Sequence, residues 1–266
     1  MFFMSQSRVE YNRWRQILEK VLPVVCDAGN LALSYSLRPG LKIETKSDGS
    51  PVTLADRDTE SWLRDRLPKV APGIGVIGEE FGEGDAGPDE NWVIDPIDGT
   101  RAFTRGLPFW ATLVALMSGG RPRIGIVHAP ALGIVAWATE GGGAWVDGCP
   151  ARVSTVSRLE DAFISIGSMD IVPEQTWAPR ALELMGRAWT TRGFGDATAY
   201  LDLIVGSIDA MVDPLVNLWD IAPIQILIEE AGGTFTGLDG QPEPRGGSGV
   251  LGSNGHIHDE MLRYFT

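Results

Sequence analysis

The chain has 266 residues, of which 44% are hydrophobic, and its formal net charge is −13. This length allows one large domain or two closely packed ones, and the composition excludes collagen-like and disordered proteins. The negative charge argues against a nucleic-acid backbone or an anionic membrane surface as the main partner. An anionic small molecule stays open as a substrate, because bound cations can reverse the local field.

Other features of the composition narrow the class further. Two cysteines, Cys26 and Cys149, are too few for a disulfide framework, and three histidines do not show the spacing of a zinc site. The N-terminus lacks the pattern of a secretory signal. No apolar run approaches the roughly 18 residues that a membrane span needs. We therefore expect a cytoplasmic protein with no membrane or nucleic-acid partner.

The first predicted elements are helices and one short strand. An amphipathic pattern predicts a long helix over 8–37, kinked or divided near Pro23. A short strand is expected at 41–45, before a turn-rich stretch. A second helix is expected over 56–67, with Thr53 as its N-cap in a capping box.

The rest of the chain divides into a strand-rich part and an alternating part. Buried-type strands at 76–80 and 92–95 run into acidic residues, and a series of short strands follows over 110–154. After a soft boundary near 155–160, strands and helices alternate, which predicts a mixed α/β arrangement in one domain over 1–266. The expected order is strand 163–168, helix 174–187, strand 188–191, helix 196–206, strand 209–213, helix 221–231 and strand 233–236.

The segment Asp95-Pro96-Ile97-Asp98-Gly99-Thr100 places two carboxylates at the end of a strand. If Thr100 opens a helix, the N–H groups of that helix favour phosphate. Carboxylates cannot hold phosphate directly, so a divalent cation is needed between them, and oxygen ligands favour Mg²⁺ or Mn²⁺. The alternative is an ordinary turn in which the aspartates only cap the next element.

Two further acidic positions favour the metal site over the turn. Glu79 follows another buried strand, and Asp220 lies at a probable helix start. Each alone is weak evidence, because acids at helix starts are ordinary caps. Together, three acidic strand or loop ends predict a shared metal site at one edge of a sheet.

The order of these motifs resembles the inositol monophosphatase superfamily of Mg²⁺-dependent, lithium-sensitive phosphatases. Asp56, Glu79-Glu80, Asp95 to Thr100, Trp219-Asp220 and the EEAGG segment at 229–233 stand in its order and at its spacings. The resemblance covers nearly the whole chain. It implies a layered αβαβα sandwich, usually assembled as a homodimer, which hydrolyses a small phosphate monoester.

The resemblance also implies the metal ligands. Glu79, Asp95 and the carbonyl of Ile97 would bind a first Mg²⁺, and Asp95, Asp98 and Asp220 a second. A third, weaker ion would use Glu79 with water, so two to three ions are expected, with Mn²⁺ able to substitute.

The remaining roles concern water and substrate. Thr100 and Asp56 would orient the attacking water, with Glu79 able to take its proton. Asp98, together with the N–H groups of Gly99 and Thr100, would face the phosphate. The sequence departs from the family pattern in one place: many members continue as WD-x-Ala-Ala-Gly, but this chain reads WDIAPI at 219–224. Pro223 is expected in the first turn of its helix, where proline is tolerated.

One branch of the superfamily fits best. The run from Asp98 to Leu116, with Arg101 after DGT, and the segment GSNGHIHDEML at 252–262 are similar to bacterial histidinol-phosphatases. That substrate carries an amine and an imidazole, so acidic side chains should line the pocket, and Asp196 and Asp213 are the candidates. Asp196 could instead be a helix N-cap, and Arg101 a solvated surface charge or a group beside the phosphate.

Several alternatives remain. The substrate could be inositol 1-phosphate, fructose bisphosphate or adenosine bisphosphate. Haloacid-dehalogenase-type phosphatases use Asp-x-Asp, whereas Asp95 and Asp98 are separated by two residues, so that geometry does not fit. The Cys-x₅-Arg of Cys-dependent phosphatases and the P-loop of nucleotide kinases do not occur in the sequence. A non-catalytic binding protein on the same fold predicts loss of ligand residues, whereas here every ligand position holds a competent residue.

Overall fold

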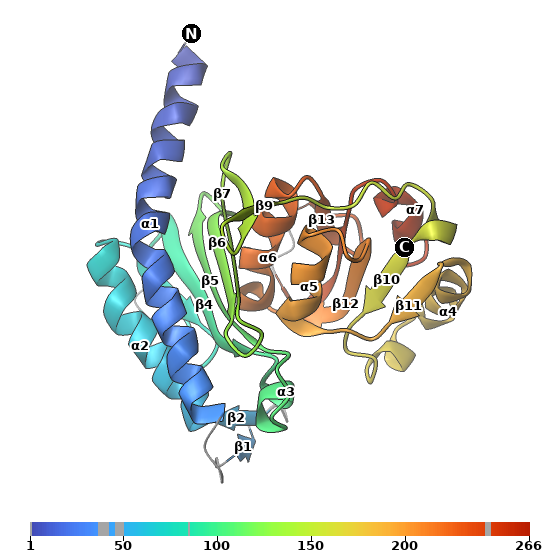
Figure 1. The fold of residues 1–266 in the computed structure, drawn as a ribbon, viewed down its shortest axis with the longest axis horizontal. Helices are drawn as coiled ribbons and strands as arrows, with labels where there is room; N and C mark the ends of the chain where they lie inside the picture. The colour runs from blue at the N-terminus through green and yellow to red at the C-terminus, as the bar shows by residue number, and fades with distance from the viewer. Residues whose placement is uncertain (1, 37–42, 46–50, 85, 243–245) are drawn as a thin grey trace.

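The computed structural model describes residues 2–36, 43–45, 51–84, 86–242 and 246–266. The helices alternate with two main sheets in five layers, in the order α, β, α, β, α (Figure 1). This is the predicted layered α/β sandwich. Its α-helices are α1 (Phe2–Ser36), α2 (Leu54–Val70), α3 (Thr100–Thr104), α4 (Ala178–Arg187), α5 (Asp196–Ile204), α6 (Leu218–Glu230) and α7 (His258–Leu262).

The larger sheet has seven strands in the order β3-β4-β5-β6-β7-β8-β9. The pair β3–β4 is parallel and all the other neighbours are antiparallel. The strands are β3 (Gly75–Gly78), β4 (Glu90–Asp98), β5 (Ala111–Ser118), β6 (Arg121–Ala129), β7 (Ile134–Thr139), β8 (Gly143–Val146) and β9 (Cys149–Ala151).

The smaller sheet has five strands in the order β11-β10-β12-β14-β13. Strand β10 is parallel to both of its neighbours, and β14 is antiparallel to both of its neighbours. These strands are β10 (Phe163–Ile166), β11 (Thr190–Arg192), β12 (Ala210–Val216), β13 (Thr234–Gly237) and β14 (Ser248–Ser253). A short antiparallel pair, β1 (Ile43–Thr45) and β2 (Pro51–Thr53), precedes α2, and two 3₁₀ turns cover Leu159–Asp161 and Val172–Glu174.

The three largest hydrophobic cores among the described residues join these layers. One lies between α1, α2 and the outer face of the large sheet, and another packs α4 and α7 against the small sheet. The third lies between the sheets, where α5 and α6 contact side chains from both of them, among them Leu113, Val127, Leu203, Ile224 and Val250. The middle layer is therefore buried on two sides, which explains why α6 is almost entirely apolar beyond its first turn.

Most of the elements confirm the sequence prediction. The first helix runs through Pro23 as one element, starting earlier than expected, and Thr53 caps α2 through a capping box. Strand β14 and helix α7 were not predicted. The predicted strand residues 41–42 and most of the turn after them lie outside the described residues.

The expectation for Pro223 is wrong in one respect. Helix α6 begins at Leu218, so Pro223 lies in its second turn, not its first. The helix nevertheless continues to Glu230, and it approaches β6 closely, because a Cβ on Gly125 would lie 2.6 Å from the Pro223 carbonyl oxygen. Among the described residues, none of the helices combines the length and the apolar composition that crossing a membrane requires.

Candidate metal centre

A bulge at the end of β4 brings Asp95 and Asp98 to one side of the strand. Asp95 pairs with Leu113 and Asp98 with Ala111, so β4 has one residue more than β5 in this interval. In a regular strand, residues three apart face opposite sides, and the extra residue removes that difference. Pro96 suits the bulge because it has no ladder N–H to lose, and its carbonyl accepts a hydrogen bond from the Thr112 hydroxyl at 2.8 Å.

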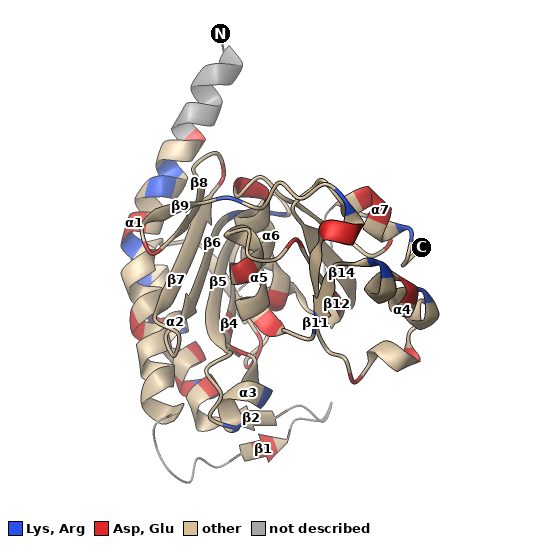
Figure 2. Ribbon diagram, turned by 45° about the vertical axis from the view of Figure 1, so that its right-hand side comes forward, with Lys and Arg blue, Asp and Glu red and all other residues tan. Residues whose placement is uncertain are grey.

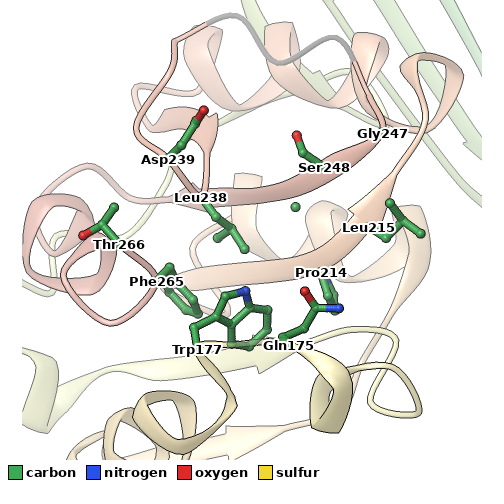
Figure 3. Close-up of a pocket in the computed structure, with 11 residues that line it drawn as sticks. Gln175, Trp177, Pro214, Leu215, Leu238, Asp239, Gly247, Ser248, Phe265 and Thr266 are labelled. Carbon is green, nitrogen blue, oxygen red and sulfur yellow. The ribbon is translucent and has the colours of Figure 1, made fainter.

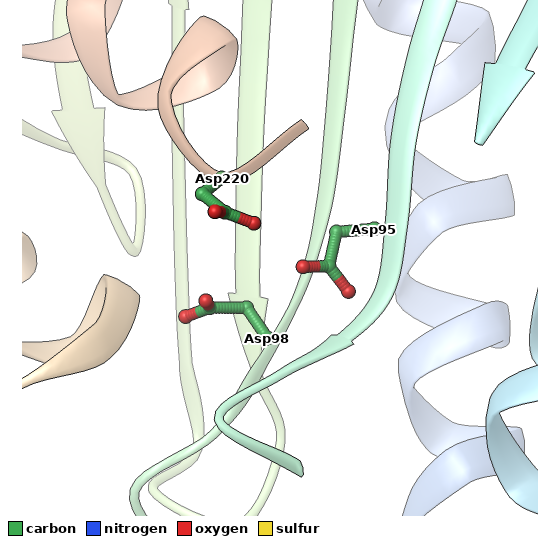
Figure 4. A group of neighbouring side chains, drawn as sticks. All are labelled: Asp95, Asp98 and Asp220. Carbon is green, nitrogen blue, oxygen red and sulfur yellow. The ribbon is translucent and has the colours of Figure 1, made fainter. Parts of the chain in front are cut away.

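Asp220 completes a group of three carboxylates. It is the third residue of α6, and its Oδ2 accepts a hydrogen bond from the backbone N–H of Asn217 at 2.6 Å in a capping box. One oxygen of Asp220 therefore caps its own helix. Ligand oxygens of Asp95, Asp98 and Asp220 lie within 4.8 Å of one another, and the three side chains point toward a common centre (Figure 4).

The electrostatics of the group favour a cation. Burial, followed by the charges of Glu79, Asp98 and Asp220, raises the pKa of Asp95 well above its usual range. Burial and the nearby Asp196 and Asp220 do the same to the pKa of Asp98. Burial raises the pKa of Asp220 to about 7. Carboxylates crowded in this way repel one another unless protons or a cation neutralise them, and their oxygen donors suit Mg²⁺.

Glu79 lies at the edge of this group. Its carboxylate is not part of the set within 4.8 Å. It is close enough to Asp95 to hydrogen bond with that side chain, and its charge raises the pKa of Asp56 and Asp220 as well. The structure thus brings the four predicted carboxylate ligands together, three of them tightly and Glu79 beside Asp95.

Asp56 and Thr100 meet next to the carboxylates, although they are 44 residues apart in sequence. The Thr100 hydroxyl lies 2.9 Å from the carbonyl oxygen of Ile97 and 3.4 Å from Oδ1 of Asp56. Oδ2 of Asp56 accepts hydrogen bonds from the Thr53 N–H and hydroxyl at 2.8 and 2.7 Å. Asp56 is fully buried, so these contacts fix its carboxylate in place and leave Oδ1 toward Thr100.

Gly99 is required by the tight turn that starts α3. Its φ is +84°, and a Cβ there would lie 2.7 Å from the carbonyl oxygen of Phe109 and 3.1 Å from Oδ2 of Asp196. Thr100 is the first residue of α3, as predicted, and no side chain caps the helix. The first N–H groups of α3 are therefore left without a side-chain cap.

Asp98 caps α5. It does not cap α3, the next element along the chain, as the alternative of an ordinary turn assumed. Its Oδ2 accepts a hydrogen bond from the backbone N–H of Ala197 at 2.5 Å, at the start of α5. Gly195 is the N-cap residue of α5, so Asp196 is not an N-cap. Asp98 thereby joins the larger sheet to the middle layer.

Arg101 lies close enough to Asp196, beside the carboxylate group, for the two charges to interact. Asp196 is itself exposed, with a φ of +57° that turns it toward Gly99. Burial raises the pKa of Asp196, and the charge of the Arg101 guanidinium opposes this rise only in part. Arg101 also forms an ion pair with Asp170 at 2.9 Å. Arg101 is thus an exposed charge, but one placed between two acids.

Asp213 lies deeper, on β12. It is 6% exposed, and its Oδ2 accepts a hydrogen bond from the Tyr200 hydroxyl at 2.7 Å. Burial raises the pKa of Asp213 to about 7, and the charges of Asp196 and Asp220 also raise it. The first turn of α5 carries an acidic residue (Figure 2). The structure therefore places Asp213 behind the entrance rather than on its rim.

A separate groove lies beside β12 and β14 of the small sheet, where the segment before α4 and the C-terminus meet them (Figure 3). Its lining includes Trp177, Leu238 and Phe265, with Asp239 as its one acidic residue, and none of the predicted site residues. The carboxylate group, not this groove, carries the chemistry expected from the sequence.

The sequence matches the profile of the inositol monophosphatase family over residues 14–266. The chain belongs to the inositol monophosphatase family. It is 43% identical to a histidinol-phosphatase of Streptomyces coelicolor, covering 94% of this chain and 96% of that protein. It is 44% identical to the histidinol-phosphatase of Mycobacterium tuberculosis, covering 84% and 87%.

Other members of the inositol monophosphatase family are more distant. A fructose-1,6-bisphosphatase/inositol-1-monophosphatase of Thermotoga maritima is 33% identical and covers 80% of this chain and 81% of that protein. A solved structure of an IMPase from the same organism superposes with a TM-score of 0.83 at 32% identity, covering 93% of this chain and 96% of the other. The layered fold is thus that of the inositol monophosphatase family.

Sequence reasoning missed three residues that contact a predicted site residue or the backbone next to one. Tyr200 binds Asp213, Asp170 binds Arg101, and Glu60 holds the backbone beside Glu79. Glu60 had a recognisable signal. It lies on the buried face of α2 with Asp56, Leu63 and Leu67, and an acid on an apolar face is unusual without a partner.

Proposed function

We propose that this member of the inositol monophosphatase family hydrolyses a small phosphate monoester with Mg²⁺. The observation that carries the proposal is the group of three carboxylates within 4.8 Å of one another, with pKa values raised by burial and mutual repulsion. Such a group needs a divalent cation to hold phosphate. Mn²⁺ should substitute for Mg²⁺, because both accept oxygen ligands.

The ligand assignments follow from where the residues lie. Glu79, Asp95 and the carbonyl oxygen of Ile97 would hold one ion, and Asp95, Asp98 and Asp220 a second, with a weaker third near Glu79. The bound ions would neutralise the phosphate dianion and hold the attacking and leaving oxygens in line. The position of Asp95 supports this assignment. Burial raises the pKa of Asp95, and the charges of Glu79, Asp98 and Asp220 raise it further, so Asp95 lies close to all three of the other carboxylates.

The chain's own groups would orient and deprotonate the attacking water. The Thr100 hydroxyl lies 3.4 Å from Oδ1 of Asp56, and Asp56 is fixed by Thr53. Thr100 would accept a hydrogen bond from the water and pass its own proton to Asp56, with Glu79 as the second acceptor for a proton. The N–H groups of Gly99 and Thr100, beside Asp98, would contact the phosphate.

We infer that histidinol phosphate is the preferred substrate. Two relatives at 43% and 44% identity carry that activity in their names. Asp196 at the entrance and the buried Asp213 offer carboxylates to the substrate ammonium, and Arg101 stands beside Asp196. Inositol 1-phosphate is the second candidate, because more distant relatives carry that name.

The same inference extends to assembly and environment. We expect a homodimer, a cytoplasmic location and inhibition by Li⁺, which would compete for the second Mg²⁺ position. The exposed apolar side chains of Leu182 and Trp189, at 69% and 70%, are available for a subunit contact.

Side-by-side kinetics with histidinol phosphate and inositol 1-phosphate test the substrate assignment. A buried acid paired with an ammonium contributes about 1.5–3 kcal/mol, so kcat/KM should favour histidinol phosphate by roughly 10- to 150-fold per contact. Asp213→Asn should raise KM for histidinol phosphate more than it affects the neutral-alcohol substrate.

A matched control is Asp239→Asn, which removes an acid from the separate groove and should change neither substrate. Equal efficiency on both substrates, or a mutant that loses both equally, would return the assignment to a general inositol-phosphatase-like enzyme.

A further inference from the structure

Glu60 is a fully buried carboxylate on α2 with no role in the proposed reaction. It accepts hydrogen bonds from the backbone N–H groups of Glu80 and Phe81, at 2.7 and 3.1 Å. Its charge is matched by Arg64, one helical turn later, at 2.8 Å. A buried charge is costly unless it is paired and hydrogen-bonded. Glu60 meets this condition, and two of its partners are backbone groups directly after Glu79.

Arg64 holds the other side of the same turn. Its guanidinium donates hydrogen bonds to the carbonyl oxygens of Val76, at 3.3 Å, and Gly82, at 2.6 Å. Gly78 and Gly82 close the turn by exchanging two backbone hydrogen bonds of 3.0 Å. The Glu60–Arg64 pair therefore contacts the backbone before the turn at 78–82, in its middle and at its last residue.

The fit between Glu60 and the turn is tight. A Cβ on Gly78 would lie 2.3 Å from Oε1 of Glu60, so the turn packs directly on this carboxylate. On the opposite side, the Glu79 N–H donates to the carbonyl oxygen of Ile94 at 3.3 Å, which ties the turn to β4. The backbone of Glu79 is thus fixed from two sides while its carboxylate reaches Asp95.

We propose that the buried Glu60–Arg64 pair is a positioning device that holds the turn at 78–82 so that Glu79 presents its carboxylate to the divalent cation. The inference rests on the proposed metal centre. Glu60 itself does not touch the cation or the substrate. Groups that orient a metal ligand without binding the metal usually affect metal affinity by about 10- to 100-fold.

Glu60→Gln is the direct test. A glutamine keeps the shape, but its NH₂ group would face a backbone N–H or the Arg64 guanidinium, so at least one contact to the turn is lost. We expect the Kd for Mg²⁺, measured by calorimetry without substrate, to rise by about 10- to 100-fold. Turnover should recover when Mg²⁺ is raised to saturation, because the reacting groups are intact.

The matched control is Asp65→Asn, on the same helix. Asp65 pairs with Lys69 at the same helical spacing, at 2.6 Å, but both side chains are exposed. Its removal should leave the Kd for Mg²⁺ unchanged. A general loss of stability in Glu60→Gln would lower the amount of folded protein, but it would not change the Kd of the folded fraction.

Arg64→Lys keeps the proposal testable if Glu60→Gln does not fold. Lysine retains the charge, but its one nitrogen cannot replace the three nitrogens with which Arg64 contacts Glu60, Val76 and Gly82, so the Kd should rise in the same direction. If the parent protein binds Mg²⁺ and a folded variant of Glu60 or Arg64 binds it equally well, the positioning role of the pair is overturned. The proposed metal centre would not be affected by that result. A parent protein that binds no divalent cation would overturn the metal centre and this role with it.

Discussion

At the scale of single residues, Asp95 is the most sensitive position in the carboxylate group. It is 2% exposed, and its pKa is raised by burial and by three neighbouring acids. Asp95→Asn preserves the shape but removes a negative charge from between the two proposed cations. We expect turnover to fall by at least ~10³-fold, as when a major electrostatic group is removed from a catalytic site. Steady-state phosphate release at saturating Mg²⁺ measures this effect.

Thr100→Ala separates metal binding from activation of water. The Thr100 hydroxyl contacts Asp56 and the carbonyl of Ile97 but is not one of the carboxylate ligands. We expect turnover to fall by roughly 10²- to 10⁴-fold, the usual contribution of general acid–base groups. The Kd for Mg²⁺ should stay close to that of the parent. A variant with full turnover would remove Thr100 from the mechanism.

The raised pKa values predict how stability depends on pH. In the metal-free protein, burial raises the pKa of Asp220 to about 7 and that of Asp95 and Asp98 well above normal. The native state then holds more protons than the unfolded state from about pH 4 upward, so the free energy of unfolding falls as the pH rises through pH 7. In EDTA, the Tm should be lower at pH 8 than at pH 5.

Mg²⁺ binds the deprotonated carboxylates, so it should oppose the fall in stability between pH 5 and pH 8. Adding Mg²⁺ should raise the Tm more at pH 8 than at pH 5, because fewer protons then compete for the ligands. A larger Mg²⁺-dependent shift at pH 5 would contradict the assignment of these carboxylates to the metal.

The residues found from sequence differ in kind from those that were missed. Asp95, Asp98 and Asp220 stand at strand and helix ends within recognisable motifs, so their meeting could be predicted. Asp170 is in a loop, and its contact with Arg101 depends on how the two halves of the chain pack. No local pattern encodes such a contact. The contact of Tyr200 with Asp213 likewise joins two different elements, α5 and β12.

At the scale of elements, the contact between α6 and β6 controls where Asp220 lies. A Cβ on Gly125 would lie 2.5 Å from the side chain of Ile226 and 2.6 Å from the carbonyl oxygen of Pro223. Gly125→Ala must therefore push α6 away from the sheet. We expect a loss of about 1–3 kcal/mol in the free energy of unfolding, as for overpacked cores, and weaker Mg²⁺ binding. Urea unfolding measures the first effect and calorimetry the second.

Gly186→Ala is the control for that substitution. Gly186 lies within α4, and a Cβ there would have no neighbour within 4 Å. Alanine is a better helix former than glycine by about 1 kcal/mol, so this variant should be as stable as the parent or more so. Equal effects from the two substitutions would argue against close packing at Gly125.

The elements that sequence analysis missed depend on their neighbours. Strand β14, with the sequence SGVLGS, contains two glycines and has little strand propensity of its own. It forms because β12 and β13 pair with it on both sides, and this cannot be deduced from a six-residue window. By contrast, α1 and α2 carry long apolar stripes, and α2 also has a capping box, so both helices were predicted, although α1 starts earlier than expected.

At the scale of the whole molecule, the shared core between the two sheets predicts cooperative unfolding of 1–266 as one domain. Side chains from β5, β6, α5, α6, β12 and β14 belong to one buried cluster, so separating the two halves would expose the core that they share. Tryptophan fluorescence and far-UV circular dichroism should report coincident urea transitions. Two separate transitions would place a domain boundary near the predicted 155–160.

The most direct test of the account is phosphate release by the metal-stripped protein with histidinol phosphate as substrate, measured as Mg²⁺ is added back. We predict no release above background in EDTA and a saturable recovery with Mg²⁺, which Asp95→Asn does not show. Undiminished release by the metal-free parent protein would contradict the assignment of the Asp95, Asp98 and Asp220 group to catalysis.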